Sequence, residues 1–184
     1  MRAQSHSPFK TIELMYISLF AVIIALCAWI SIPTAIPFTL QTFGVCLCAG
    51  LLKTKNAVMA VLVYILLGAV GAPVFAGFSG GMGILLSPLG GYIIGFLLSA
   101  VVIGLLRKVL GRKLPGLIIA MIAGLCCCYA VGTVWYMVVY AQNSGTIGLI
   151  TALSWCVLPF IIPDLAKITA AALLVQRLQP YLKA

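Results

Sequence analysis

The chain has 184 residues, of which 64% are hydrophobic and only 7% are charged, and its mean hydropathy is +1.26. Soluble domains carry charge on about a quarter of their residues, so this composition excludes a water-soluble protein and indicates an integral membrane protein. The net charge of +9 comes from basic residues scattered over loops, without the clusters of aromatic and basic side chains that bind nucleic acid.

Six apolar runs follow one another along the chain. A helix that crosses a bilayer needs about 20 residues, and most of the runs approach or exceed this length. The sequence therefore predicts an all-α integral membrane protein with six transmembrane helices, the second and third short. We expect a single membrane domain over residues 1–184, with tails at both ends, the first over residues 1–11. The runs lie at about 12–32, 39–52, 56–71, 88–106, 115–141 and 149–176.

The basic residues test this helix count, because Lys and Arg concentrate in short loops on the cytoplasmic side. With six helices, ten of the 11 basic residues fall on one side and the loops on the other side carry none. Five helices, with 39–71 as one bent hairpin, would lose this segregation. We expect both termini in the cytoplasm and a multi-pass protein of the cytoplasmic (inner) membrane. The ten residues are Arg2, Lys10, Lys53, Lys55, Arg107, Lys108, Arg112, Lys113, Arg177 and Lys183.

The first run combines two features. Its apolar part, Leu14–Ile32, is longer than the roughly 7–15 residues of a secretory signal core, and we expect it to be a retained helix. Small residues recur along it at spacings of three and four, at Ser18, Ala21, Ala25 and Ala28. Such a stripe lets another helix approach closely, and both packing within the chain and a surface for a partner explain it.

Seven cysteines lie within the apolar runs. Neighbouring residues on a helix point about 100° apart, so the run Cys126–Cys128 cannot close on one metal ion. We expect these cysteines to be small packing residues and the protein to hold no metal.

The glycine-rich segment 71–83 joins the third and fourth predicted helices on the side without basic residues. Glycines let the backbone fold tightly against a ligand, and Phe75 and Phe78 supply apolar contact. We interpret the segment as a loop that caps a pocket, with a plain flexible connection as the alternative. The glycine and lysine pattern of a phosphate-binding loop is absent from the sequence.

Asp164 and Lys167 lie in the last apolar run, at a depth where a charge costs several kcal/mol. Their i,i+3 spacing places them on one face of a helix. The pair can be a structural ion pair, a ligand site or a catalytic acid and base. A buried ion pair contributes little net stability, and no histidine or activated nucleophile accompanies this one, so a ligand site is favoured.

Two prolines stand close to this pair. Pro159 and Pro163 each remove a backbone donor, so we expect the helix to bend or break there. A break at Pro163 would also turn the positive end of a helix outward, towards a bound anion.

Four motifs stand together in an order and spacing that is specific. Their residues are Pro37–Gly44, Leu67–Gly77, Pro88–Phe96 and Pro163–Lys167. With these motifs the chain resembles the BioY family over about residues 12–178. Members of that family are the biotin-capturing S components of energy-coupling factor (ECF) vitamin transporters.

The resemblance implies an outward-facing site for biotin, capped by the loops after the first and third helices. Biotin would offer the N–H groups of its ureido ring to Asp164, while Lys167 would join that cluster or hold the carboxylate. In place of an amide side chain the capping loop has Phe78 and Ser79. The implied ligand-binding residues are Asp164, Lys167, Tyr92, Phe75, Ser79, Gly80 and Gln41.

The resemblance also implies partners. Ala21 and Ala25 match the Ala-xxx-Ala motif by which S components dock on the transmembrane coupling subunit. Because the sequence has no nucleotide-binding motif, ATPase subunits would supply the energy; no cofactor is expected. Two alternatives remain: a stand-alone biotin facilitator, and a small integral-membrane enzyme that uses Asp164 and Lys167 in acid–base chemistry.

Overall fold

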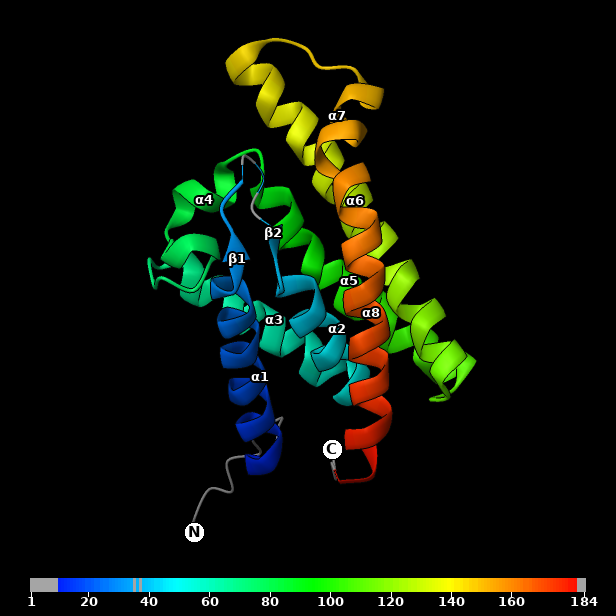
Figure 1. Ribbon diagram of the computed structural model, residues 1–184. Helices are drawn as coiled ribbons and strands as arrows, with labels where there is room; N and C mark the ends of the chain where they lie inside the picture. The colour runs from blue at the N-terminus through cyan, green and yellow to red at the C-terminus, as the bar shows by residue number, and fades with distance from the viewer. Residues whose placement is uncertain (1–9, 35, 37, 182–184) are drawn as a thin grey trace.

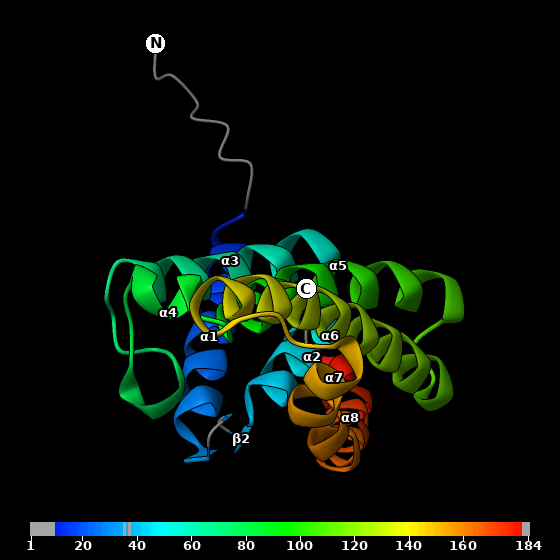
Figure 2. The same ribbon diagram turned by 90° about the horizontal axis from the view of Figure 1, so that it is seen from above.

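Figure 1 shows the computed structural model, which describes residues 10–34, 36 and 38–181, with the side chains of residues 143 and 144 excepted. Within these residues the fold is a bundle of helices that belongs to the all-α class (Figures 1 and 2). The expectations that concern Arg2, Pro37 and Lys183 lie outside the described residues.

Four helices in the described part of the chain are long and apolar enough to cross a membrane. Two shorter apolar helices lie between the first and second of these. They correspond to the second and third predicted runs. The four long helices are α1 (Thr11–Trp29), α5 (Gly90–Leu110), α6 (Leu114–Ser144) and α8 (Leu158–Leu178), and the two shorter ones are α2 (Gln41–Leu51) and α3 (Thr54–Ala69).

Glycine and proline mark the ends of the two central helices. α5 ends at Gly111 (φ 80°) and α6 at Gly145 (φ 92°), in left-handed backbone that glycine adopts without a steric cost. Pro115 stands in the first turn of α6, where its missing N–H would have no partner in the helix anyway.

The last predicted run contains two helices. α7 (Leu149–Cys156) is separated from α8 at Val157, whose backbone (φ −122°, ψ −54°) departs from the helix. The expected break at Pro163 does not occur, because α8 continues through this residue, while a bend there stays a prediction. Pro159 lies in the first turn of α8, where proline is tolerated. The N-terminal, positive end of α8 therefore lies at Leu158, which precedes Pro163, where a helix start was expected.

Short elements fill the connections at the end opposite the start of α1. β1 (Ser31–Ile32) and β2 (Phe38–Thr39) pair antiparallel after α1. After α3, the glycine-rich segment forms a 3₁₀ turn, η1 (Ala76–Phe78), and a short helix, α4 (Met82–Leu86). Gly77 has φ 67° and Phe75 pairs with Ser79, so the segment has a defined fold. Another 3₁₀ turn, η2 (Gln179–Tyr181), follows α8.

α5 and α6 lie side by side in both views and pack closely through glycine (Figures 1 and 2). A Cβ atom at Gly132 would overlap the ring of Tyr92, and one at Gly91 would overlap the side chain of Trp135. Glycine at these positions allows the two helices to approach until an aromatic ring of one covers the backbone of the other. This contact fixes the position of Tyr92, which matters for the site below.

Candidate ligand-binding site

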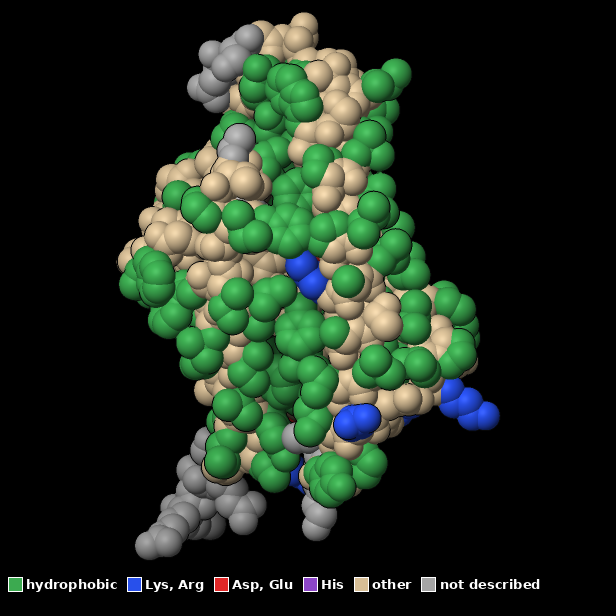
Figure 3. Space-filling model, viewed as in Figure 1, with side chains coloured by type: hydrophobic (Ala, Val, Ile, Leu, Met, Phe, Trp, Pro, Cys, Tyr) green, Lys and Arg blue, Asp and Glu red, His purple; other side chains and the backbone are tan. Residues whose placement is uncertain are grey.

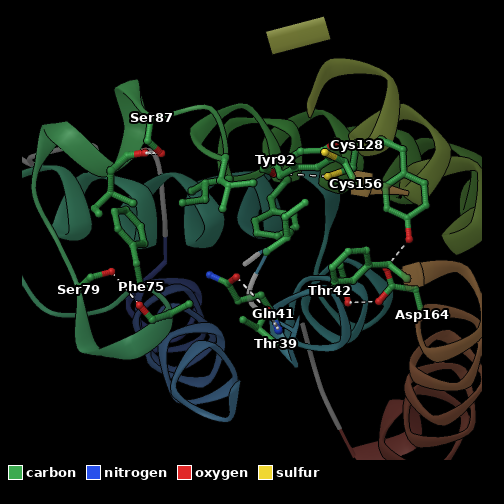
Figure 4. Close-up of a pocket in the computed structure, with 18 of the residues that line it drawn as sticks. Thr39, Gln41, Thr42, Phe75, Ser79, Ser87, Tyr92, Cys128, Cys156 and Asp164 are labelled. Carbon is green, nitrogen blue, oxygen red and sulfur yellow. Dashed lines mark hydrogen bonds between the residues drawn. The ribbon is translucent and has the colours of Figure 1, made fainter. Parts of the chain in front are cut away.

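A cavity of about 230 Å³ lies among α2, α5, α6, α8 and the connection from α3 to α4. Figure 4 shows its lining, in which aromatic and aliphatic side chains surround a few polar groups. Small-molecule sites commonly have this composition, because apolar walls hold the body of a ligand and a few polar atoms orient it. The polar lining residues are Thr39, Gln41, Thr42, Ser79, Ser87, Tyr92, Tyr129, Asp164 and Lys167.

The carboxylate of Asp164 is the centre of the polar cluster and is only 3% exposed. Its Oδ1 atom accepts hydrogen bonds from Lys167 Nζ at 2.7 Å and from Thr42 Oγ1 at 3.0 Å. Its Oδ2 atom accepts one from the hydroxyl of Tyr129 at 2.5 Å. Figure 4 shows Thr42 and Asp164 facing each other. Three donors from three different helices therefore compensate the burial of this charge.

Lys167 connects α8 to the strand before α2. Its ammonium group donates to Asp164 Oδ1 and, at 2.7 Å, to the backbone carbonyl of Thr39. The same nitrogen lies 4.3 Å from the ring centroid of Phe38, a distance at which a cation is attracted to an aromatic face. Phe38 in turn stacks on Phe160, with centroids 5.5 Å apart. The opposite charges of the pair cancel, so the polar end of the cavity carries no net charge from side chains.

Gln41 begins α2 and is buried. Its Nε2 atom donates to the hydroxyl of Tyr64 at 2.5 Å, and its Oε1 atom accepts from Thr39 Oγ1 at 3.0 Å. The amide is held by two partners and borders the same strand whose carbonyl binds Lys167.

The apolar side of the cavity depends on two aromatic residues. The ring of Tyr92 covers Gly132, and its hydroxyl lies 3.1 Å from Thr133 Oγ1. Phe75 is 1% exposed and meets the ring of Tyr64 edge to face, with centroids 5.6 Å apart. These contacts within the protein hold both rings in place.

The structure brings six of the seven predicted ligand-binding residues to the cavity: Asp164, Lys167, Tyr92, Phe75, Ser79 and Gln41. Gly80 is not among the described lining residues. It packs against the backbone carbonyl of Ala72, where no Cβ would fit. Ser79 uses its hydroxyl to donate to the carbonyl of Ala76 at 2.8 Å, which stabilises the turn beside the cavity.

Two polar residues of the cluster were not singled out from the sequence. Thr42 lies within one of the quoted motifs but has no pattern of its own, and Tyr129 follows the cysteine run on α6. The only general signal is that a buried aspartate needs several donors. That requirement does not say which helices supply them.

Ala21 and Ala25 lie on the inner face of α1, where they are 2% and 6% exposed. The close approach of α1 and α2 shows at Gly44, where a Cβ would lie 3.3 Å from the Cα atom of Ile24. The structure thus shows packing within the chain at these positions. The docking of a partner there stays a prediction.

The chemistry of the cavity is that of a binding site. It can accept N–H donors at Asp164, offer a cation at Lys167 and bury an apolar ring system against Phe75 and Tyr92. Among the described residues, no group of three or more His, Cys, Asp and Glu side chains is placed to hold a metal ion.

These features define a class: a multi-pass membrane protein with a pocket for a small molecule buried in its helical bundle. The model of the BioY family matches residues 1–184. The chain therefore belongs to the BioY family, as the four motifs predicted.

Similar proteins from distant organisms cover almost the whole chain. A biotin transporter BioY from Thermotoga maritima is 41% identical over 168 residues, which are 91% of this chain and 95% of that one. A probable biotin transporter BioY from Pyrococcus horikoshii is 37% identical over 92% of this chain and 98% of its own. A biotin transporter BioY from Rhodobacter capsulatus is 34% identical, with 90% and 92% covered.

The fold also matches a solved structure. It is the crystal structure of the S-component for biotin from an ECF-type ABC transporter, with a TM-score of 0.82 and 28% sequence identity. The match covers 92% of this chain and 91% of that one.

Proposed function

We propose that this protein captures biotin with high affinity and serves in biotin uptake as the substrate-binding subunit of an ECF-type transporter. The observation that carries the proposal is the cavity with the Asp164–Lys167 pair at its polar end, in a member of the BioY family. The names of the similar proteins and the solved S-component support biotin as the ligand. The same names support transport over the alternative of a membrane enzyme.

The cavity suggests how biotin is held. The ureido ring has two N–H donors and lies at Asp164, where a ligand N–H replaces the hydroxyl of Thr42 while Tyr129 keeps its hydrogen bond. The fused rings and the tail lie against Phe75 and Tyr92. Lys167 either stays with Asp164 or turns to the carboxylate of the ligand.

The proposed topology has six membrane passes, both termini in the cytoplasm and the cavity open to the outside, in one membrane domain over the whole chain. α1 begins and α8 ends at the same end of the molecule (Figure 1). Most of the Lys and Arg side chains visible in Figure 3 lie towards that end. A basic end is expected on the cytoplasmic side of the inner membrane, which supports this orientation.

We further propose that a coupling subunit and ATPase subunits complete the transporter. Docking on Ala21 and Ala25 remains part of this proposal, and because both are buried, a partner that reaches them must separate α1 from its neighbours. The exposed residues Leu19, Val22 and Leu26 of α1 offer the partner its first contact.

Equilibrium binding of biotin to the solubilised protein tests the proposal. We expect tight binding by the wild type and a loss of at least about tenfold in Asp164→Asn and Lys167→Ala, because hydrogen bonds to charged groups contribute about 1.5–3 kcal/mol. Lys113→Ala, an exposed lysine of the loop between α5 and α6, is the control and should bind as the wild type does. If the wild type does not bind biotin, the proposed function is wrong. If both site variants bind biotin as the wild type does, the assignment of Asp164 and Lys167 to the site is wrong.

Reconstitution in vesicles separates the proposal from a stand-alone facilitator. The purified chain should not accumulate labelled biotin against a gradient without ATPase subunits. Concentrative uptake by the chain alone would contradict the role of a dependent subunit.

A further inference from the structure

A second hollow, of about 390 Å³, lies at the opposite end of the bundle from the connections β1–β2 and α4. It is formed where α3 begins and α5 ends. Its lining is almost entirely cationic and consists of Lys53, Thr54, Lys55, Arg107, Lys108 and Arg112. Five positive side chains around one hollow repel one another, and a bound anion would reduce this repulsion.

The chain itself cannot supply that anion from its acidic side chains. It has only two acidic residues. Glu13 pairs with Lys53 at 3.2 Å, and Asp164 pairs with Lys167 at 2.7 Å in the distant cavity. No side-chain carboxylate of the sequence remains for Lys108 and Arg112, both of which are exposed. Both residues are therefore open to an anion from another molecule.

Arg107 links the two segments that form the hollow. It is 4% exposed, and its guanidinium donates to the backbone carbonyls of Gly50 and Leu52 at the end of α2. These bonds fix the loop that carries Lys53 against the last turn of α5. Hydrogen bonds therefore connect the two segments that carry the cations on either side of the hollow.

The position of the hollow indicates the source of the anion. α5 has 21 residues and is therefore about 31 Å long, close to the thickness of the hydrocarbon core of a bilayer, which is about 30 Å. Arg107 and Lys108 stand in its last turn and thus reach the level of the lipid headgroups. Basic pockets between helices on the cytoplasmic side are suited to anionic headgroups.

We propose that this hollow binds the phosphate group of an anionic phospholipid of the inner leaflet. The site is separate from the biotin cavity and does not depend on the ligand proposed for it. The phosphate lies between Lys108 and Arg112, with the N-terminal end of α3 facing the same anion.

Titration of the purified, delipidated protein with phosphatidylglycerol or phosphatidylcholine, followed by native mass spectrometry, tests the proposal. The site variant is Lys108→Gln/Arg112→Gln. The control is Lys113→Gln/Arg177→Gln, which removes two exposed charges outside the hollow. Arg107 is kept because of its bonds to α2. Circular dichroism and gel filtration confirm that both variants are folded.

The wild type should prefer phosphatidylglycerol to phosphatidylcholine. At about 1 kcal/mol for each basic residue near an anionic lipid, the site variant should lose on the order of thirtyfold in affinity for phosphatidylglycerol and the control almost none. Equal losses of affinity for phosphatidylglycerol in the site variant and the control would contradict the assignment of the site to Lys108 and Arg112. Displacement of the lipid by millimolar inorganic phosphate would overturn the lipid as the source. A wild type that binds both lipids equally would overturn the proposal.

Discussion

Tyr129 and Lys167 hold opposite oxygens of the Asp164 carboxylate, and this determines how the carboxylate is turned towards the cavity. We predict that Tyr129→Phe weakens biotin binding by about tenfold, because it removes a hydrogen bond of about 1.5 kcal/mol or more to a charged group without changing the shape of the wall. Calorimetric titration with biotin measures the effect.

The matched control is Tyr140→Phe, whose ring stacks on Tyr136 outside the cavity. It should bind biotin as the wild type does. Tighter binding by Tyr129→Phe would show the opposite relation, in which the tyrosine hydroxyl competes with the ligand for Asp164.

The central pair of the site could be predicted from the sequence, because a spacing of three residues on a helix dictates proximity. The ion pair of Asp164 and Lys167 confirms that geometry. Thr42 and Tyr129 could not be predicted, since they are 122 and 35 residues away from Asp164 along the chain. Their positions follow from the packing of α2 and α6 against α8, which no local pattern encodes.

The contact between α5 and α6 couples packing to the shape of the cavity. In Gly132→Ala the added Cβ overlaps the ring of Tyr92 and must push the ring or the helices apart. We expect a loss of about 1–3 kcal/mol in stability, as for other overpacked interiors, and weaker biotin binding as Tyr92 moves. Thermal unfolding in detergent and a binding titration measure the two effects.

Gly83→Ala provides the comparison, because nothing lies within 4 Å of the Cβ that it adds on α4. It should leave both the melting temperature and the binding almost unchanged. A Gly132→Ala protein as stable as Gly83→Ala would mean that the contact between α5 and α6 is looser than the structure shows.

The apolar runs of the sequence predicted five helices well, since the bounds of α1, α2, α3, α5 and α6 agree closely with those of the runs. It failed where the chain bends without a change in composition. Val157 separates α7 from α8 although it is an ordinary apolar residue, while Pro163 continues the helix. The hairpin of β1 and β2 and the short α4 were also missed, because elements of two to five residues show no periodicity.

The course of the chain as a whole leads to a prediction about topology. A fluorescent protein fused to either terminus should fold and fluoresce, since both ends are proposed to lie in the cytoplasm. Alkaline phosphatase inserted at Thr146, in the connection between α6 and α7, should be active because that connection is proposed to lie outside. Fluorescence from only one terminus would require an odd number of passes and contradict the six-helix proposal.

The mutual neutralisation of Asp164 and Lys167 has an electrical consequence for the whole molecule. The empty cavity contributes no net charge, so the membrane potential exerts no net force on this part of the protein. Bound biotin adds the single negative charge of its carboxylate. Moving one charge through 100 mV changes the free energy by about 2.3 kcal/mol. In a cell with a negative interior, voltage would thus distinguish the loaded protein from the empty one and oppose inward movement of the loaded form.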